Sequence, residues 1–189
     1  MPQVIECEEK FFCNHTPTLF HFIEKELGFY FQKKVFETDT YFKDKNNKYI
    51  QPDTCLRLRE SDSQLLELTS KKILHKDDRI KIEKTYTFSP LKKERILSLL
   101  KRIGITPYCT VFKDRFIYTL KKENLLYSVM IDIVNEKTSF LELEIVTNSN
   151  DINFEQKLND FATLFKSFNL KKTSQNYRDF TIETQLKKI

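Results

Sequence analysis

The chain has 189 residues, of which 40% are hydrophobic and 31% charged, and its 32 Lys and Arg residues exceed its 27 Asp and Glu residues. This composition is too apolar for a disordered chain, and no apolar run approaches the roughly 20 residues of a membrane-spanning helix. A net charge of +5 suits an anionic ligand, but without a basic stripe it does not indicate nucleic-acid binding. We therefore predict one folded domain over residues 1–189, with neither a membrane nor a nucleic acid as partner.

Glycines and cysteines narrow the functional classes further. Gly28 and Gly104 are the only glycines, which excludes a P-loop and a dinucleotide-binding Gly-x-Gly-x-x-Gly motif. Any phosphate must therefore be held by side chains. The four cysteines include no CxxC pair, and no histidine lies near one at metal-ligand spacing, so we predict reduced, buried thiols in a cytoplasmic protein.

The first half of the chain is predicted to hold four strands and two helices. A strand at about residues 4–11 comes first, and a helix follows, with Thr16 as its cap and Gly28 at its end. Three more strands are predicted over 55–60, 65–71 and 79–85. A second helix begins at Ser89 and Pro90 and ends at Gly104.

The second half is predicted to hold three strands followed by two helices. Strands are predicted over 111–116, 129–133 and 140–146, where apolar and charged residues alternate. A third helix is predicted over about 153–168, and a short fourth helix after Ser174. No linker or repeat divides these elements, which is why we predict a single domain.

All seven predicted strands carry charged side chains on one face and aliphatic side chains on the other. A single strand of this kind is usually amphipathic with a solvated face, but seven together favour a barrel whose lumen is charged and whose outside is covered by helices. Buried charges need partners, so the basic groups would meet a ligand with several negative charges and the carboxylates would hold divalent cations. The sequence thus predicts an α+β fold, a closed antiparallel β-barrel of about eight strands with helices outside, enclosing a metal-dependent tunnel for a polyphosphate-like substrate.

The residues on this charged face resemble the signature of the CYTH superfamily, the triphosphate tunnel metalloenzymes. Glu6-x-Glu8-x-Lys10 is similar to the ExExK motif of that family, and the resemblance extends from Val4 to about Tyr177. The further matches, in order, are Asp39 with Tyr41, Arg57-x-Arg59, Leu68-Thr69-x-Lys71, Lys113-x-Arg115, Asp132, and Glu142-x-Glu144. The chain departs from the family's Arg-x-Glu-x-Glu run in one strand, so no role is assigned to Arg79, Lys81 or Glu83.

The resemblance implies that a triphosphate, as ATP or tripolyphosphate, binds lengthwise in the tunnel. The implied phosphate-binding residues are Lys10, Arg57, Arg59, Lys71, Lys113 and Arg115. The implied ligands of one or two Mg²⁺ or Mn²⁺ ions are Glu6, Glu8, Asp132, Glu142 and Glu144. Hydrolases of the family can use a Lys–Tyr pair to assist the attacking water, and Lys10 and Tyr41 would occupy those catalytic places.

The C-terminal third resembles one branch of this family more than the others. The segment KLNDFATLFKSFNL and the following Ser174-x-x-Tyr177 are similar to the end of bacterial class IV adenylate cyclases, which convert ATP to cAMP and pyrophosphate. Triphosphate hydrolases occur in the same branch, so an inorganic or nucleoside triphosphatase is the alternative. A non-catalytic polyphosphate- or nucleotide-binding module is a second alternative. We expect a monomer or a homodimer.

Overall fold

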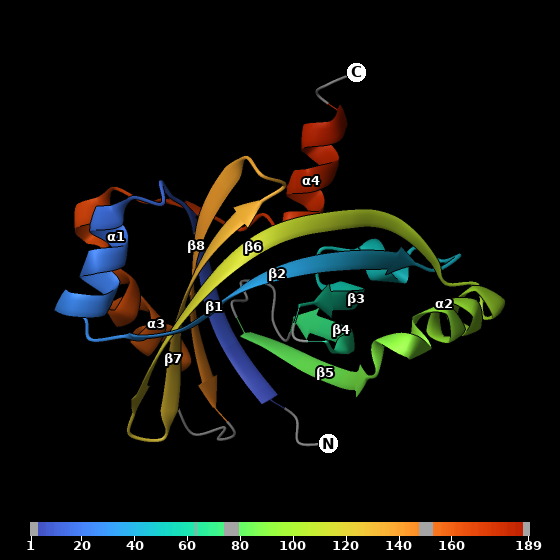
Figure 1. Cartoon of the computed structure of the whole chain (residues 1–189), viewed down its shortest axis with the longest axis horizontal. Coiled ribbons are helices and arrows are strands. Elements are labelled where there is room, and N and C mark those ends of the chain that lie inside the picture. The colour runs from blue at the N-terminus through green and yellow to red at the C-terminus, as the bar shows by residue number, and fades with distance from the viewer. Residues whose placement is uncertain (1–3, 63, 74–79, 148–152, 187–189) are drawn as a thin grey trace.

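The computed structural model describes residues 4–62, 64–73, 80–147 and 153–186, which form a curved antiparallel sheet flanked by helices (Figure 1). Nine strands are present in the described residues. They are β1 (Val4–Phe12), β2 (Tyr30–Lys43), β3 (Thr54–Ser61), β4 (Leu66–Ile73), β5 (Ile80–Phe88), β6 (Thr106–Lys122), β7 (Leu125–Val134), β8 (Thr138–Thr147) and β9 (Lys171–Thr173). The α-helices are α1 (Pro17–His21), α2 (Lys93–Arg102), α3 (Phe154–Thr163) and α4 (Tyr177–Leu186).

Local sequence signals place the ends of the first two helical segments, although the one predicted from Ser89 and Pro90 starts as a 3₁₀ turn at Pro90–Lys92 and α2 itself begins at Lys93. The Thr16 hydroxyl accepts a hydrogen bond from the Leu19 amide at 3.3 Å and so caps α1, which continues as a π-helical segment over Phe22–Glu26. Gly28 follows with a φ of +70°, and Gly104 follows α2 with a φ of +80°, a backbone region that other residues adopt at a cost. The predicted third helix is divided into α3 and a 3₁₀ turn at Lys166–Phe168.

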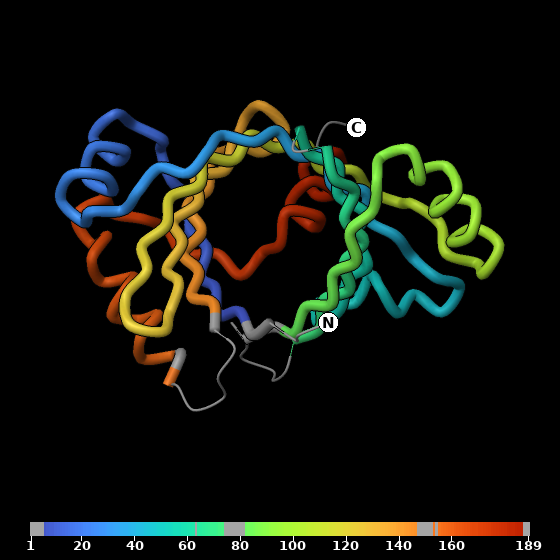
Figure 2. The backbone as a smooth tube through the Cα atoms, turned by 60° about the horizontal axis from the view of Figure 1, so that its bottom comes forward, coloured from blue at the N-terminus to red at the C-terminus, as the bar shows by residue number. Residues whose placement is uncertain are grey.

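The sheet curves around a common axis, and the strands lie in the order β5-β4-β3-β2-β6-β7-β8-β1-β9 (Figure 2). β1 also pairs with β5, through a short ladder that runs from Val4 opposite Glu83 to Cys7 opposite Ile80. β9 pairs with the same strand farther along, at Lys10–Phe12. The predicted antiparallel sheet with helices packed outside is confirmed, whereas full closure into a barrel stays a prediction because only this short ladder joins β5 to β1.

Three hydrophobic clusters hold the helices against the sheet. The largest lies under α1 and α3, where Leu19, Leu158 and Phe161 pack on aliphatic residues of β7 and β8. A second cluster forms where Ile96 and Leu100 of α2 pack on β3 and β4. Helices thus cover much of the apolar side of the sheet, although Phe36 of β2, Tyr86 of β5 and Phe112 of β6 stay about half exposed, and the charged face is turned inward.

The C-terminal segment takes a different course from the other helical segments. A third cluster joins Tyr177 of α4 to Phe140 of β8 and to Val111 of β6. In Figure 2 the chain leading into α4 crosses the space that the strands surround. No helix in the described residues is long and apolar enough to cross a membrane.

Candidate functional site

The inward face of the sheet and the start of α4 line a cavity of about 760 Å³. Its walls include every phosphate-binding residue that the sequence predicts, namely Lys10, Arg57, Arg59, Lys71, Lys113 and Arg115. They also include Tyr41 and four of the predicted metal ligands, Glu6, Glu8, Glu142 and Glu144. Asp132 lies behind this lining with none of its surface exposed. The alternation along the strands therefore places nearly the whole predicted set around one cavity.

Three carboxylates converge in this cavity. Glu6 and Glu8 belong to β1, Glu144 lies opposite Glu8 on β8, and one oxygen from each lies within 4.8 Å of the others. Burial, together with the negative charges of Glu6, Glu142 and Glu8, raises the pKa of Glu144 to about 8. Converging carboxylate oxygens are the ligands that Mg²⁺ and Mn²⁺ prefer. This donor set, which we call the acidic trio, fits a divalent cation.

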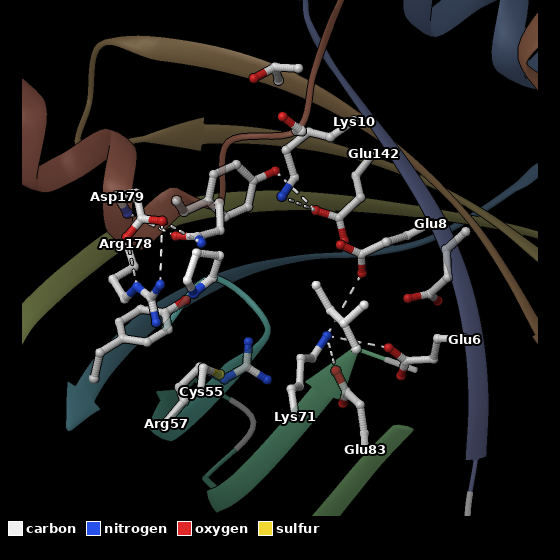
Figure 3. A pocket seen from close by; sticks show the side chains of 18 of the residues that line it. Glu6, Glu8, Lys10, Cys55, Arg57, Lys71, Glu83, Glu142, Arg178 and Asp179 are labelled. Atoms are coloured by element: carbon white, nitrogen blue, oxygen red, sulfur yellow. Dashed lines mark hydrogen bonds and ion pairs between the residues drawn. The ribbon is translucent and has the colours of Figure 1, made fainter. Parts of the chain in front are cut away.

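Lys71 of β4 lies beside the acidic trio (Figure 3). Its Nζ is 3.3 Å from Glu6 Oε2 and 3.8 Å from Glu8 Oε2, and it also contacts Glu83 of β5. The unassigned Glu83 therefore lines the cavity and pairs with a predicted phosphate-binding lysine. Arg79, another residue without an assigned role, lies outside the residues that the structure describes.

A second acidic group, Glu37 and Asp39 on β2, is paired with cations. Arg59 Nε and Nη2 donate to the two Asp39 oxygens at 2.6 and 2.9 Å, and Arg59 Nη1 donates to Glu37 at 3.0 Å. Lys113 Nζ lies 2.9 Å from Glu37 and 3.3 Å from Asp39. Burial alone would raise the pKa of Glu37, but Lys113, Arg115 and Arg59 lower it to about 2. We call these four residues, Glu37, Asp39, Arg59 and Lys113, the ionic block.

Arg57 differs from its neighbour Arg59 in how many partners it has. Its Nη1 is 3.6 Å from Asp39 Oδ2, a distance at which the ion pair is loose. Its Nε is buried and has no hydrogen-bond partner in the part of the chain that the structure describes. An anion bound in the cavity would give this buried donor the hydrogen bond that it lacks, so Arg57 would be stabilised more than Arg59 by such a ligand.

The two remaining predicted metal ligands are bound to basic groups instead. Arg115 donates to both Asp132 oxygens, at 2.7 and 2.6 Å. Glu142 Oε2 lies 3.4 Å from Arg115 Nη2 and 3.6 Å from Lys10 Nζ, and it accepts a hydrogen bond from the Tyr177 hydroxyl at 3.1 Å. Neither carboxylate belongs to the close group formed by the acidic trio. Their role as metal ligands stays a prediction.

The structure places Lys10 against a second tyrosine, Tyr177, in addition to the cavity that it shares with Tyr41. Lys10 Nζ lies 4.0 Å from the ring centroid of Tyr177, a cation–π distance. Tyr41 lines the cavity opposite Arg57 on the neighbouring strand, with 8% of its surface exposed. Burial and the charge of Asp39 raise the pKa of Tyr41, so its hydroxyl keeps its proton. The catalytic role of the pair Lys10 and Tyr41 stays a prediction.

Sequence analysis missed two residues that shape this cavity. Glu37 lies two residues before Asp39 on β2, and the alternation Glu37-Thr38-Asp39-Thr40-Tyr41 would have revealed it as a further inward-facing charge. Arg178 lines the cavity from α4, and no local pattern distinguishes it from the other basic residues of the chain.

Comparison with known proteins agrees with this architecture. The CYTH domain family model matches residues 4–177, so the chain belongs to the CYTH family. A Methanocaldococcus jannaschii protein named "putative adenylate cyclase" is 33% identical over 153 residues, which cover 78% of this chain and 81% of that protein.

Solved structures share the same fold at low sequence identity. A Pyrococcus horikoshii protein matches with a TM-score of 0.76 and 19% identity, covering 95% of this chain and 99% of that one. The "putative adenylyl cyclase HpAC1" of Hippeastrum, described with a dominant triphosphatase activity, matches with a TM-score of 0.63 and 15% identity, covering 92% of each chain.

Proposed function

We propose that this protein is a divalent-metal-dependent enzyme that acts on a triphosphate group bound in the cavity. The observation that carries this proposal is the pairing of two unlike sites within one cavity. The acidic trio provides oxygen ligands that are incompletely neutralised, and Arg57 provides a buried donor without a hydrogen-bond partner. A cation and a polyanion bound together would satisfy both sites at once.

Each part of the cavity has a distinct task in this proposal. Glu6, Glu8 and Glu144 would hold the metal, which when bound neutralises charge on the phosphoryl group and activates the attacking oxygen. Arg57 and Lys10 would bind phosphate oxygens through charge-assisted hydrogen bonds. We further propose that the strands close into a tunnel, a proposal supported by the ladder between β1 and β5.

For the reaction, we propose adenylate cyclase activity of class IV. The ribose 3′-hydroxyl of ATP would attack the α-phosphorus, the bond from that phosphorus to the bridging oxygen would break, and pyrophosphate would leave with cAMP as the other product. The name of the Methanocaldococcus jannaschii relative, at 33% identity, supports this choice. The motif Ser174-x-x-Tyr177 near the end of the chain supports it as well.

Hydrolysis of a triphosphate is the second candidate, and one contact favours it. A nucleobase would need an open aromatic face for stacking, but the Tyr177 ring already lies 4.0 Å from Lys10 Nζ and 5.4 Å from Lys113 Nζ. Recognition would then rest on the triphosphate itself, as for tripolyphosphate. The triphosphatase activity described for the Hippeastrum protein supports the same candidate.

Product analysis separates these candidates. The purified protein is incubated with ATP and with tripolyphosphate, under Mg²⁺ and Mn²⁺ separately, with EDTA as the metal-free control. Formation of cAMP and pyrophosphate supports the cyclase, and release of orthophosphate without cAMP supports the triphosphatase. Binding of tripolyphosphate with no turnover under either metal would indicate a non-catalytic binding module. Absence of both binding and turnover would contradict the proposal.

A further inference from the structure

Arg178, near the start of α4, is a basic residue of the cavity wall whose guanidinium is already fully engaged. Only 2% of its surface is exposed. Its Nη1 donates to the carbonyls of Tyr49 and Thr54, at 3.1 and 3.2 Å. Its Nη2 donates to the carbonyls of Ile50 and Gln51, at 3.3 and 3.4 Å, and its Nε donates to Asp179 at 2.8 Å. Every nitrogen of the guanidinium therefore has a protein acceptor, so Arg178 is not a phosphate ligand.

The preceding residue, Tyr177, contacts the charged groups inside the cavity. Its ring lies against the ammonium groups of Lys10 and Lys113, and its hydroxyl donates to Glu142 at 3.1 Å. Only 5% of its surface is exposed. The ring thus lies close to two lysines to which the family resemblance assigns phosphate binding.

These two neighbouring residues connect the cavity to a loop that is distant in the sequence. Arg178 binds residues 49–54, and Thr54 begins β3, which carries Arg57 three residues later. Because Tyr177 directly precedes Arg178, the same bonds also hold the backbone from which its ring extends. The clamp formed by Arg178 therefore acts on both sides of the cavity.

We propose that Arg178 is a positioning residue for triphosphate binding: by tying the start of α4 to residues 49–54, it keeps the Tyr177 ring against Lys10. This inference rests on the proposed function of the cavity. Without the clamp, the ring loses its fixed place against Lys10, and the Lys10 ammonium group can move toward Glu142, which lies 3.6 Å away. Lys10 would then be less available to the phosphate oxygens, whereas Lys113 is already paired with Glu37 at 2.9 Å.

A double-mutant cycle on tripolyphosphate affinity tests this coupling. Affinity is measured by calorimetry in EDTA, where metal-dependent turnover is absent, for the wild type, Arg178→Gln, Tyr177→Leu and the double variant. We expect each single variant to bind about tenfold more weakly, which is the loss of one charge-assisted contact, and the double variant to bind no more weakly than either. Arg178→Lys should recover part of the affinity. The exposed Arg102→Gln on α2 is the matched control and should bind like the wild type.

Two results would overturn the inference while leaving the proposed function intact. One is wild-type affinity in Arg178→Gln. The other is a double variant whose loss of tripolyphosphate affinity is the product of the two single losses, because the two residues would then act independently. Melting curves identify a variant that does not fold. If Arg178→Gln does not fold, Arg178→Lys replaces it in the double-mutant cycle with Tyr177→Leu. If the wild type itself fails to bind tripolyphosphate in EDTA and with Mg²⁺, the proposed function fails instead.

Discussion

The acidic trio and the ionic block both contain carboxylates on the inward face of the sheet, but they have opposite electrostatics. In the ionic block, Arg59 and Lys113 compensate the acidic residues, and the pKa of Glu37 falls to about 2. In the acidic trio, like charges accumulate and the pKa of Glu144 rises to about 8. The first arrangement is complete without a ligand, whereas the second is stabilised by an added cation.

Strand register produces this difference. Asp39 of β2 lies opposite Arg59 of β3, so a negative charge faces a positive one. Glu8 of β1 lies opposite Glu144 of β8, so two acidic groups face each other and the pKa of Glu144 rises. Opposite charges in such positions stabilise a sheet and like charges destabilise it. A sheet that retains the unfavourable pair is a candidate for binding a metal at that place.

The largest expected effect comes from breaking the ionic block. Asp39→Asn would leave Arg59 and Lys113 buried without their main counter-charge, and we expect it to lower the free energy of unfolding by about 3–5 kcal/mol. Chemical denaturation measures this loss. Asp114→Asn is the matched control, because Asp114 pairs with Lys34 at the surface and its loss should cost less than about 1 kcal/mol. Equal stability of the two variants would contradict the structural role of the block.

Neutralising the acidic trio should affect activity rather than folding. Glu144→Gln removes a metal ligand, and we expect turnover of the triphosphate substrate to fall by at least about a hundredfold. Its melting temperature in EDTA should match or exceed that of the wild type, because fewer like charges meet. Glu155→Gln on the exposed side of α3 is the control. Full activity of Glu144→Gln would refute the metal site.

Replacing the two arginines of β3 one at a time should affect different properties: Arg57 the binding of tripolyphosphate, and Arg59 the stability of the fold. We expect Arg57→Gln to weaken tripolyphosphate binding by about tenfold or more with little change in melting temperature, because its Nε has no hydrogen bond to lose within the described residues. Arg59→Gln should mainly lower the melting temperature, because it breaks three hydrogen bonds to Asp39 and Glu37. Calorimetry and thermal melting of both variants test this division, which fails if Arg59→Gln is as stable as Arg57→Gln.

The last prediction concerns how the acidic trio makes the stability of the fold depend on pH. The pKa of Glu144 is about 8 in the folded protein and near its ordinary value of 4.5 in the unfolded chain. Between these values the folded state holds the extra proton, so stability falls as the pH rises, by at most about 1.4 kcal/mol per pH unit. The measurement is the free energy of unfolding in EDTA from pH 5 to 8, as the difference between the wild type and Glu144→Gln. If the difference in free energy of unfolding does not change with pH, the raised pKa of Glu144 is contradicted. Mg²⁺ should reduce this pH dependence.

Local sequence determined the ends of the helices and the inward face of the strands. Thr16 caps α1 through its own hydroxyl, and Gly28 and Gly104 follow the helical segments with positive φ. Alternation along a strand fixes which side chains share a face, because successive residues point in opposite directions. Glu6, Glu8 and Lys10 could therefore be assigned to the cavity from the sequence alone.

Only the tertiary structure decided which of these charges meet. Glu8 and Asp39 both occupy inward-facing positions in strands where polar and apolar residues alternate. Glu8 nevertheless faces Glu144 and Asp39 faces Arg59, because the register between strands that are distant in the sequence sets the partners. Lys10 lies against Tyr177, a contact that no local pattern predicts, since α4 returns to the cavity from the far end of the chain. The clamp of Arg178 on residues 49–54 has the same origin: its acceptors are backbone carbonyls, which carry no sequence signal, brought near by folding.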